Sequence, residues 1–104
     1  MHPVYVIKTV VREDLCGKFE KFMNERHIAD VLATGTFFRA SFYSTGPGQY
    51  IIIYEARGRA ELDTYLETRA GALRADFSSA FPQGIQISRE EWSALAAETP
   101  GERP

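Results

Sequence analysis

Few side chains in this chain have the chemistry of a catalytic or binding group. His27 is the candidate general acid or base, because the unperturbed pKa of imidazole lies close to neutrality. Arg39 is the candidate anchor for an anionic group of a substrate. Tyr43, Tyr54 and Tyr5 are the candidate hydrogen-bond donors. These five residues form the predicted site, with His27 in the catalytic role and the others in substrate binding.

Each candidate also has a simpler structural role. His27 could cap the end of a helix by bonding a free carbonyl, or lie exposed to solvent. Arg39 could pair with Glu55 across a hairpin or within an interface between subunits. Tyrosines are more often core or interface residues with a satisfied hydroxyl than catalytic acids. The residues alone therefore leave both kinds of role open.

Other chemistries find no support in the sequence. The chain has two histidines and one cysteine, Cys16, so it lacks the ligand spacing of a zinc site and cannot form an internal disulfide. Residues 46–48, Gly-Pro-Gly, are too short for a phosphate-binding loop and do not lead into a helix. No serine lies in a Gly-x-Ser-x-Gly motif. We therefore expect no metal and no cofactor.

Length and composition predict one ordinary globular domain. The chain has 104 residues, 44% of them hydrophobic and 25% charged. We assign residues 1–97 to this domain and expect the polar, proline-containing tail, 98–104, to be disordered. A net charge of −2 and a pI near 5.7 argue against nucleic-acid and anionic-membrane partners. Without a signal-peptide pattern or a long apolar run, the expected location is the cytoplasm.

The pattern of hydrophobic residues predicts a β-α-β-β-α-β order of elements, which is the α+β ferredoxin-like arrangement. It comprises a four-stranded antiparallel sheet with two helices on one face. The expected strands are 4–11, 36–44, 49–55 and one beginning at 85, and the expected helices are 13–27 and one beginning near 59. Residues 88–91 fit a capping box, so 89–97 could be helical, or the last strand could continue to Trp92.

The end of the first helix needs a change in its course. At about 100° per residue, Ile28 falls opposite Phe19 on a helical wheel, so a straight helix would leave Ile28 in water. We therefore predict a break near His27 that returns Ile28, Val31 and the residues that follow to the core. Gly35 is expected to end this segment in the left-handed conformation.

Residues 27–35, His-Ile-Ala-Asp-Val-Leu-Ala-Thr-Gly, follow this aromatic-rich amphipathic helix. The segment resembles a motif of a family of small uncharacterised bacterial proteins in the dimeric α/β-barrel, ferredoxin-like superfamily, and the resemblance covers residues 4–90. The chain differs at Ala29, where the family usually has proline. Because the family has no assigned activity, the resemblance implies a fold and no reaction.

Superfamily resemblance also suggests where a site would lie. Similar dimeric α/β barrels include cofactor-independent oxygenases, isomerases and cyclases, with pockets between sheet and helices or inside the barrel. By this analogy we expect a small apolar pocket for an aromatic or polyketide-like molecule. Whether the chain is an enzyme is left open, because a non-catalytic ligand-binding or accessory dimer would use the same pocket.

The predicted sheet is apolar on both faces, although two helices can cover only one. Residues 50–54 are apolar throughout, and the first strand has hydrophobic residues on both sides. We therefore expect a homodimer in which the uncovered faces meet, as the superfamily resemblance also implies. RNA-recognition domains share this order of elements, but the third strand lacks their Lys/Arg-Gly start and the chain is acidic.

Overall fold

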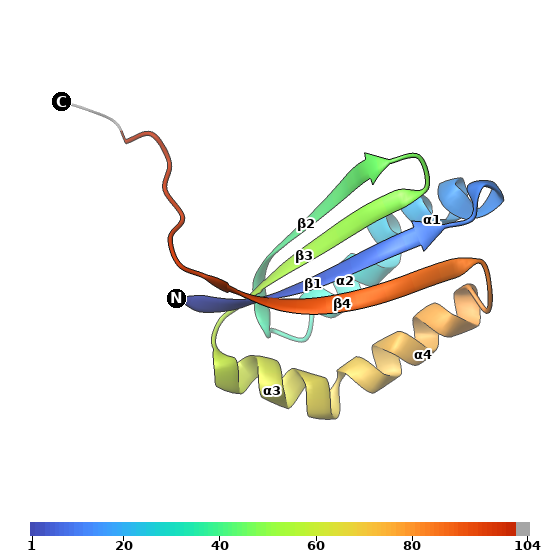
Figure 1. Ribbon diagram of the computed structural model, residues 1–104. Helices are drawn as coiled ribbons and strands as arrows, with labels where there is room; N and C mark the ends of the chain where they lie inside the picture. Colours follow the sequence, from blue (N-terminus) through green and yellow to red (C-terminus); the bar gives the residue numbers. More distant parts are fainter. Residues whose placement is uncertain (102–104) are drawn as a thin grey trace.

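The computed structural model describes residues 1–101 and confirms the ferredoxin-like α+β fold. Four strands form one antiparallel sheet in the order β2-β3-β1-β4, and the helical segments pack against one of its faces (Figure 1). The strands are β1 (His2–Val11), β2 (Phe37–Gly46), β3 (Gln49–Ala56) and β4 (Ile85–Ala94). The helical segments are η1 (Glu13–Leu15), α1 (Cys16–Phe22), η2 (Met23–His27), α2 (Ile28–Leu32), α3 (Arg59–Thr68) and α4 (Ala70–Ala80).

The first helix does not break near His27, which corrects the sequence-based prediction. Instead η2 is a wider π-helical turn, in which the Ile28 N–H donates to the Met23 carbonyl five residues earlier. A π-helical turn contains one residue more than an α-helical turn. Around the helix axis, Val31 therefore lies where residue 30 of a regular α-helix would lie, about 20° from Phe19 at 100° per residue. Val31 is accordingly buried, and Gly35 ends the segment at a φ of +79° as predicted.

A β-bulge also changes which aromatic residue of β2 enters the core. Phe37 pairs with Ala56 and Arg39 with Glu55, so one additional residue of β2 lies between these pairs. Phe37 is therefore buried, whereas Phe38 is 48% exposed. Without the bulge, simple alternation along β2 would place Phe38, rather than Phe37, on the same face as Ala40 and Phe42.

The structure defines the second helical region and the last strand, whose extents the sequence left open. The second helical region divides at Arg69 (φ −120°, ψ −36°) into α3 and α4, which run in different directions (Figure 1). β4 continues past Trp92 because every residue from Ile85 to Ala94 pairs with β1, so the helical alternative for 89–97 is wrong there. Residues 95–101 leave the domain without regular structure, and the last three residues of the predicted tail lie outside the described residues.

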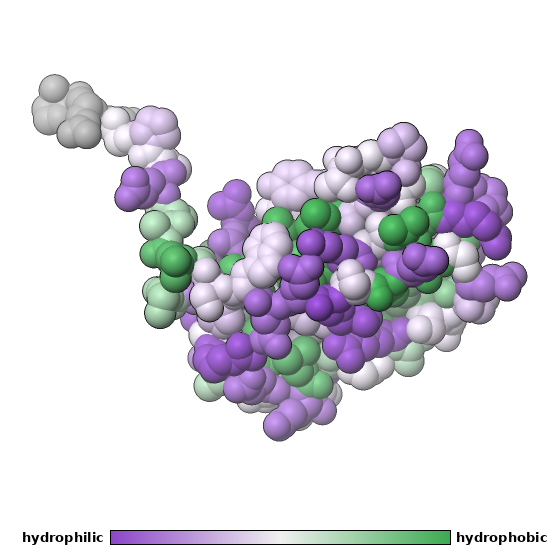
Figure 2. All heavy atoms as spheres, viewed as in Figure 1, coloured by the Kyte–Doolittle hydropathy of each residue, from purple (hydrophilic) through white to green (hydrophobic). Residues whose placement is uncertain are grey.

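The two faces of the sheet differ in what covers them. The helix-covered face holds an aromatic core that includes Phe19, Phe37, Tyr54 and Phe77. On the open face Val4 and Val6 are buried by neighbouring side chains, while Tyr43 and Trp92 are about half exposed. Figure 2, viewed toward the open face, shows green apolar groups between purple polar ones.

Candidate functional site

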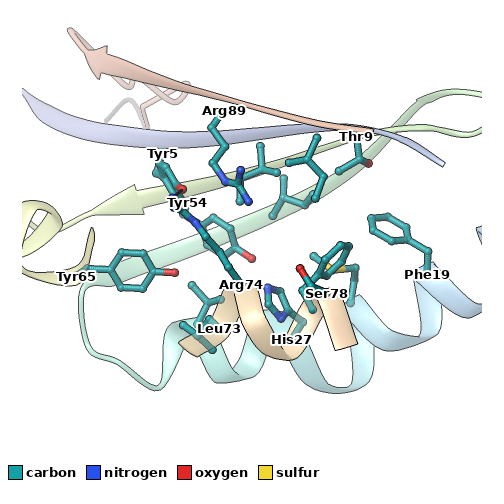
Figure 3. A pocket seen from close by; sticks show the side chains of 16 residues that line it. Tyr5, Thr9, Phe19, His27, Tyr54, Tyr65, Leu73, Arg74, Ser78 and Arg89 are labelled. Carbon is teal, nitrogen blue, oxygen red and sulfur yellow. Dashed lines mark hydrogen bonds between the residues drawn. The ribbon is translucent and has the colours of Figure 1, made fainter. Parts of the chain in front are cut away.

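A cavity of about 70 Å³ lies inside the helix-covered half of the molecule, between the sheet and the helices (Figure 3). Its walls come from β1, β3 and β4 on the sheet side, and from the first helical region, α3 and α4 on the other. Most lining side chains are aromatic or aliphatic. The cavity is therefore a product of the whole fold rather than of one loop.

Three buried polar atoms that face this cavity have no hydrogen-bond partner. They are Thr9 Oγ1 on β1, His27 Nδ1 at the end of η2, and Tyr54 OH on β3. Leaving such a group unpaired in the interior costs about 1–3 kcal/mol. Because these are all the unpartnered buried side-chain polar atoms of the described residues, the cavity is the place where a polar partner is needed.

The π-helical turn η2 ends at His27, and the imidazole ring of His27 lies in the core. The imidazole stacks on Phe22 at 5.5 Å between ring centroids and meets Phe77 edge-on at 5.6 Å. Burial lowers the pKa of His27, opposed by the nearby carboxylates of Asp76 and Asp30. The ring is thus neutral at pH 7 and available to accept a proton or to donate one hydrogen bond.

Three tyrosines surround the other end of the cavity. Burial raises the pKa of Tyr54 above its ordinary value, and burial followed by the neighbouring Tyr5 raises the pKa of Tyr65 to about 12. Tyr5 OH accepts a hydrogen bond from the Arg74 guanidinium at 2.8 Å. The hydroxyls of Tyr54 and Tyr65 are therefore protonated at neutral pH and can donate hydrogen bonds.

The structure brings together three of the five predicted site residues and separates the other two. His27, Tyr54 and Tyr5 line the cavity. Arg39 and Tyr43 lie on the open face, where they line a groove of about 310 Å³ beside Trp92. Arg39 is exposed and its Nε lies 3.4 Å from Glu55 Oε2, the hairpin pairing weighed as its simpler role. A single pocket containing all five residues is therefore not formed within one chain.

Sequence reasoning missed five polar residues of the cavity, namely Thr9, Tyr65, Arg74, Ser78 and Arg89. Thr9 lies in the inward phase of β1 between Ile7 and Val11, and Arg89 lies in the inward phase of β4 after Ile87. A polar residue in the apolar phase of a strand was the signal that could have found both. Arg74 and Tyr65 also line the cavity, but their positions on α4 and α3 carry no comparable signal.

The described residues hold no cluster of three or more histidine, cysteine or acidic side chains placed to bind a metal ion. Among the helices described, none is long and apolar enough to cross a membrane.

The site consists of hydrogen-bonding groups in an aromatic cavity with two arginines.

The fold and this buried cavity define the class as a ferredoxin-like α+β protein. Within that class the chain belongs to the family described as a domain of unknown function, DUF4286, whose sequence model matches residues 2–94. The match covers every strand and helix. It confirms the resemblance to an uncharacterised family and assigns no activity.

Solved structures with the same fold share little sequence with this chain. NE2512, a protein of unknown function from Nitrosomonas europaea, is 16% identical at a TM-score of 0.67, with 97% of this chain and 96% of that chain covered. The monooxygenase ActVA-Orf6 of Streptomyces coelicolor, solved with nanaomycin D, is 14% identical at a TM-score of 0.73 over 96% and 93%. SnoaB, a cofactor-independent oxygenase from Streptomyces nogalater, is 15% identical at 0.66 over 93% and 97%. No curated protein matches the sequence significantly.

Proposed function

We propose that this protein binds a small aromatic or polyketide-like molecule in the cavity and transforms it without a cofactor. The observation that carries the proposal is the convergence of Thr9 Oγ1, His27 Nδ1 and Tyr54 OH on one cavity without partners of their own. Fold relatives that include a cofactor-independent oxygenase and a monooxygenase with a bound ligand support it as analogy.

The chemistry that suits these groups is proton abstraction next to an oxygen. Neutral His27 accepts a proton from a phenolic O–H or from a C–H beside a carbonyl, because burial has lowered its pKa rather than raised it. Tyr54 OH donates a hydrogen bond to the oxygen on which negative charge develops. This first step is common to isomerases, cyclases and cofactor-independent oxygenases.

The size of the cavity favours a single ring over an extended polyketide. Its volume of about 70 Å³ leaves room for roughly five waters, since one water needs about 10–15 Å³ of such space. Typical ligand pockets measure about 300–1,000 Å³. An engineered cavity that binds benzene measures about 150 Å³, so even one ring requires α4 to move somewhat away from the sheet. The helix division at Arg69 is the place where α4 could turn.

The open face supports a homodimer as the assembly. Val10, Tyr43 and Trp92 are each about half exposed there, and no helix of the described residues covers them. We propose that a second copy packs its own open face against these side chains. Native mass spectrometry of the purified protein tests the dimer and any co-purified small molecule in one spectrum, and a purely monomeric spectrum would contradict the dimer.

Phenol and phenylacetone are suitable probes of the cavity. Phenol titrated into isotope-labelled protein should shift the amide signals of cavity residues, and Tyr54→Phe should weaken its binding about tenfold. Tyr43→Phe is the matched control, because it makes the same change on the open face and should leave binding unaltered. Shifts confined to the open face, or equal effects of the two variants, would overturn the proposed location.

Exchange of the α-protons of phenylacetone with deuterated water separates an enzyme from a passive binder. The wild-type protein should accelerate this exchange, and His27→Gln should abolish the acceleration while phenylacetone still binds. If the two proteins give the same exchange rate, His27 is not a base and the protein is a non-catalytic ligand-binding module.

A further inference from the structure

Two arginines stand at the mouth of the cavity without a carboxylate partner. Arg74 reaches it from α4 and Arg89 from β4, and both side chains point into the space between the helices and the sheet (Figure 3). Both also line a shallower depression on the adjoining surface, together with Tyr5. The cavity and the surface are therefore connected at a point that carries two positive charges.

Neighbouring acids do not neutralise this pair. Glu90 is paired with Lys8 at 2.7 Å, and Glu91 is paired with Arg59 at 2.7 Å. Neither Arg74 nor Arg89 has an acidic partner within 4.0 Å among residues 1–101, and Arg74 donates its hydrogen bond to the hydroxyl of Tyr5. In a chain of net charge −2, two unpaired guanidinium groups beside one cavity are an unusual arrangement.

We infer that the ligand is a small aromatic carboxylate, whose carboxylate is held by Arg74 and Arg89 while its ring enters the cavity. Guanidinium groups bind carboxylates through two parallel hydrogen bonds, which fixes the orientation of the anion as well as its charge. The buried hydroxyl of Tyr54 and the imidazole of His27 then meet polar substituents at the far end of the ring. This inference rests on the proposed function, and it specifies the class of ligand that the cavity takes.

The narrow cavity favours a carboxylate over larger anions. A planar carboxylate attached to one ring fits between an aromatic cavity and two guanidinium groups at its mouth, whereas a tetrahedral phosphate is bulkier. Tyr5 contributes here as a positioning residue, because its hydroxyl accepts the hydrogen bond that holds Arg74 at the mouth.

The test compares a benzoate with its neutral counterpart. Isothermal titration of the full-length protein with 3-hydroxybenzoate, 3-hydroxybenzamide and phenyl phosphate measures how much the charge and its shape contribute. We expect the carboxylate to bind at least tenfold more tightly than the amide, with an affinity that falls as salt is added. Binding of the carboxylate should also exceed that of phenyl phosphate.

Arginine variants locate the anion site. The double variant Arg74→Gln/Arg89→Gln should weaken binding of the carboxylate about 10- to 100-fold and leave binding of the amide within twofold. Lys21→Gln is the control, because it removes the same charge from an exposed residue outside the cavity and should change neither affinity. Both arginines of the test are exposed, so thermal unfolding should show an unchanged fold.

The outcomes distinguish this inference from the proposed function beneath it. If the amide binds in the cavity as tightly as the carboxylate, or if the double variant binds both as the wild type does, the carboxylate site is overturned and the cavity proposal stands. Tighter binding of phenyl phosphate overturns the carboxylate in favour of a phosphate. If neither aromatic probe binds, both proposals fail.

Discussion

The two faces of the sheet carry similar apolar residues, but they differ in what covers them and in how their polar groups are paired. On the helix-covered face the chain closes its own core and leaves a cavity with three unpartnered polar atoms inside it. On the open face polar residues pair with one another, as in Lys8 with Glu90 and His2 with Glu55, around a row of valines and isoleucines. Among the described residues, the buried side-chain polar atoms that have no partner all lie on the closed side of the sheet.

Each face of the sheet therefore lacks something different. The covered face has the hydrophobic contacts for stability and lacks partners for its buried polar atoms, which points to a ligand. The open face has paired charged groups and leaves Tyr43 and Trp92 about half exposed, which points to a second copy. Substitutions on the two faces should therefore affect different measurements.

The largest expected difference between the faces is in stability. Phe19 is fully buried and its ring contacts Tyr50 at 4.9 Å and Phe77 at 6.1 Å between centroids. Phe19→Ala should lower the free energy of unfolding by about 3–5 kcal/mol. Tyr43→Ala on the open face should lower it by less than about 1 kcal/mol. Urea denaturation at one protein concentration measures both, and equal losses would remove the distinction.

The next largest effect concerns association. Trp92 is 42% exposed on the open face, so placing a carboxylate there should weaken a dimer by about 2 kcal/mol, or roughly 30-fold in dissociation constant. Ala72→Glu, at an exposed position of α4, is the control and should leave the dimer intact. Sedimentation velocity over a range of concentrations gives both constants. A Trp92→Glu protein that dimerises like the control would assign the contact elsewhere.

Removing the hydroxyl from either of two tyrosines of β3 should change the stability of the protein in opposite directions. Tyr50 OH donates to Glu20 Oε2 at 2.5 Å, so Tyr50→Phe should lower the free energy of unfolding by about 1.5–3 kcal/mol. Tyr54 OH has no partner, so Tyr54→Phe should raise the stability of the ligand-free protein by about 1 kcal/mol. Thermal unfolding of the two variants makes the comparison, and a loss in both would show that bound water already satisfies Tyr54.

The smallest expected effect is a dependence on pH. Burial lowers the pKa of His27 in the folded protein, whereas the carboxylates of Asp76 and Asp30 oppose this shift and Arg26 adds to it. The unfolded chain therefore binds more protons near and below the ordinary value of 6.5, and stability falls as the pH drops through that value toward the folded pKa. Above about pH 7 this contribution is complete.

Denaturation curves from pH 5 to 8 measure this dependence. The wild type should lose more stability below pH 6.5 than His27→Gln does, because the variant lacks the titrating ring. Equal slopes for wild type and His27→Gln would show that His27 is as easily protonated in the folded protein as in the unfolded one.

The regular elements could be predicted from the sequence because their signals are local. β1 and the hairpin of β2 and β3 follow from β-branched runs and from the Gly-Pro-Gly turn, where Gly48 adopts a φ of +70°. The continuation of β4 could not be predicted, because it depends on pairing with β1 far away in the chain. Local pattern thus determined the number and order of the elements, and tertiary contacts determined where some of them end.

The candidate site was predictable only in part, for the same reason. His27, Tyr54 and Tyr5 were identified from their chemistry, and the structure places them in one cavity. Arg39 was grouped with them although it lies on the opposite face, because alternation gives the faces of a strand and not which of them the helices cover. Arg74 comes to the cavity only through the packing of α4, which no local pattern shows.

The π-helical turn at residues 23–27 has a consequence for the history of the fold. A helix that holds one residue beyond the regular count has the form of an α-helix that accepted a single-residue insertion without shifting the elements on either side. Deleting one residue there would restore a plain α-helix with both flanking segments still facing the core. We therefore expect relatives one residue shorter at this point to keep the same architecture, with a regular α-helix in place of the π-helical turn.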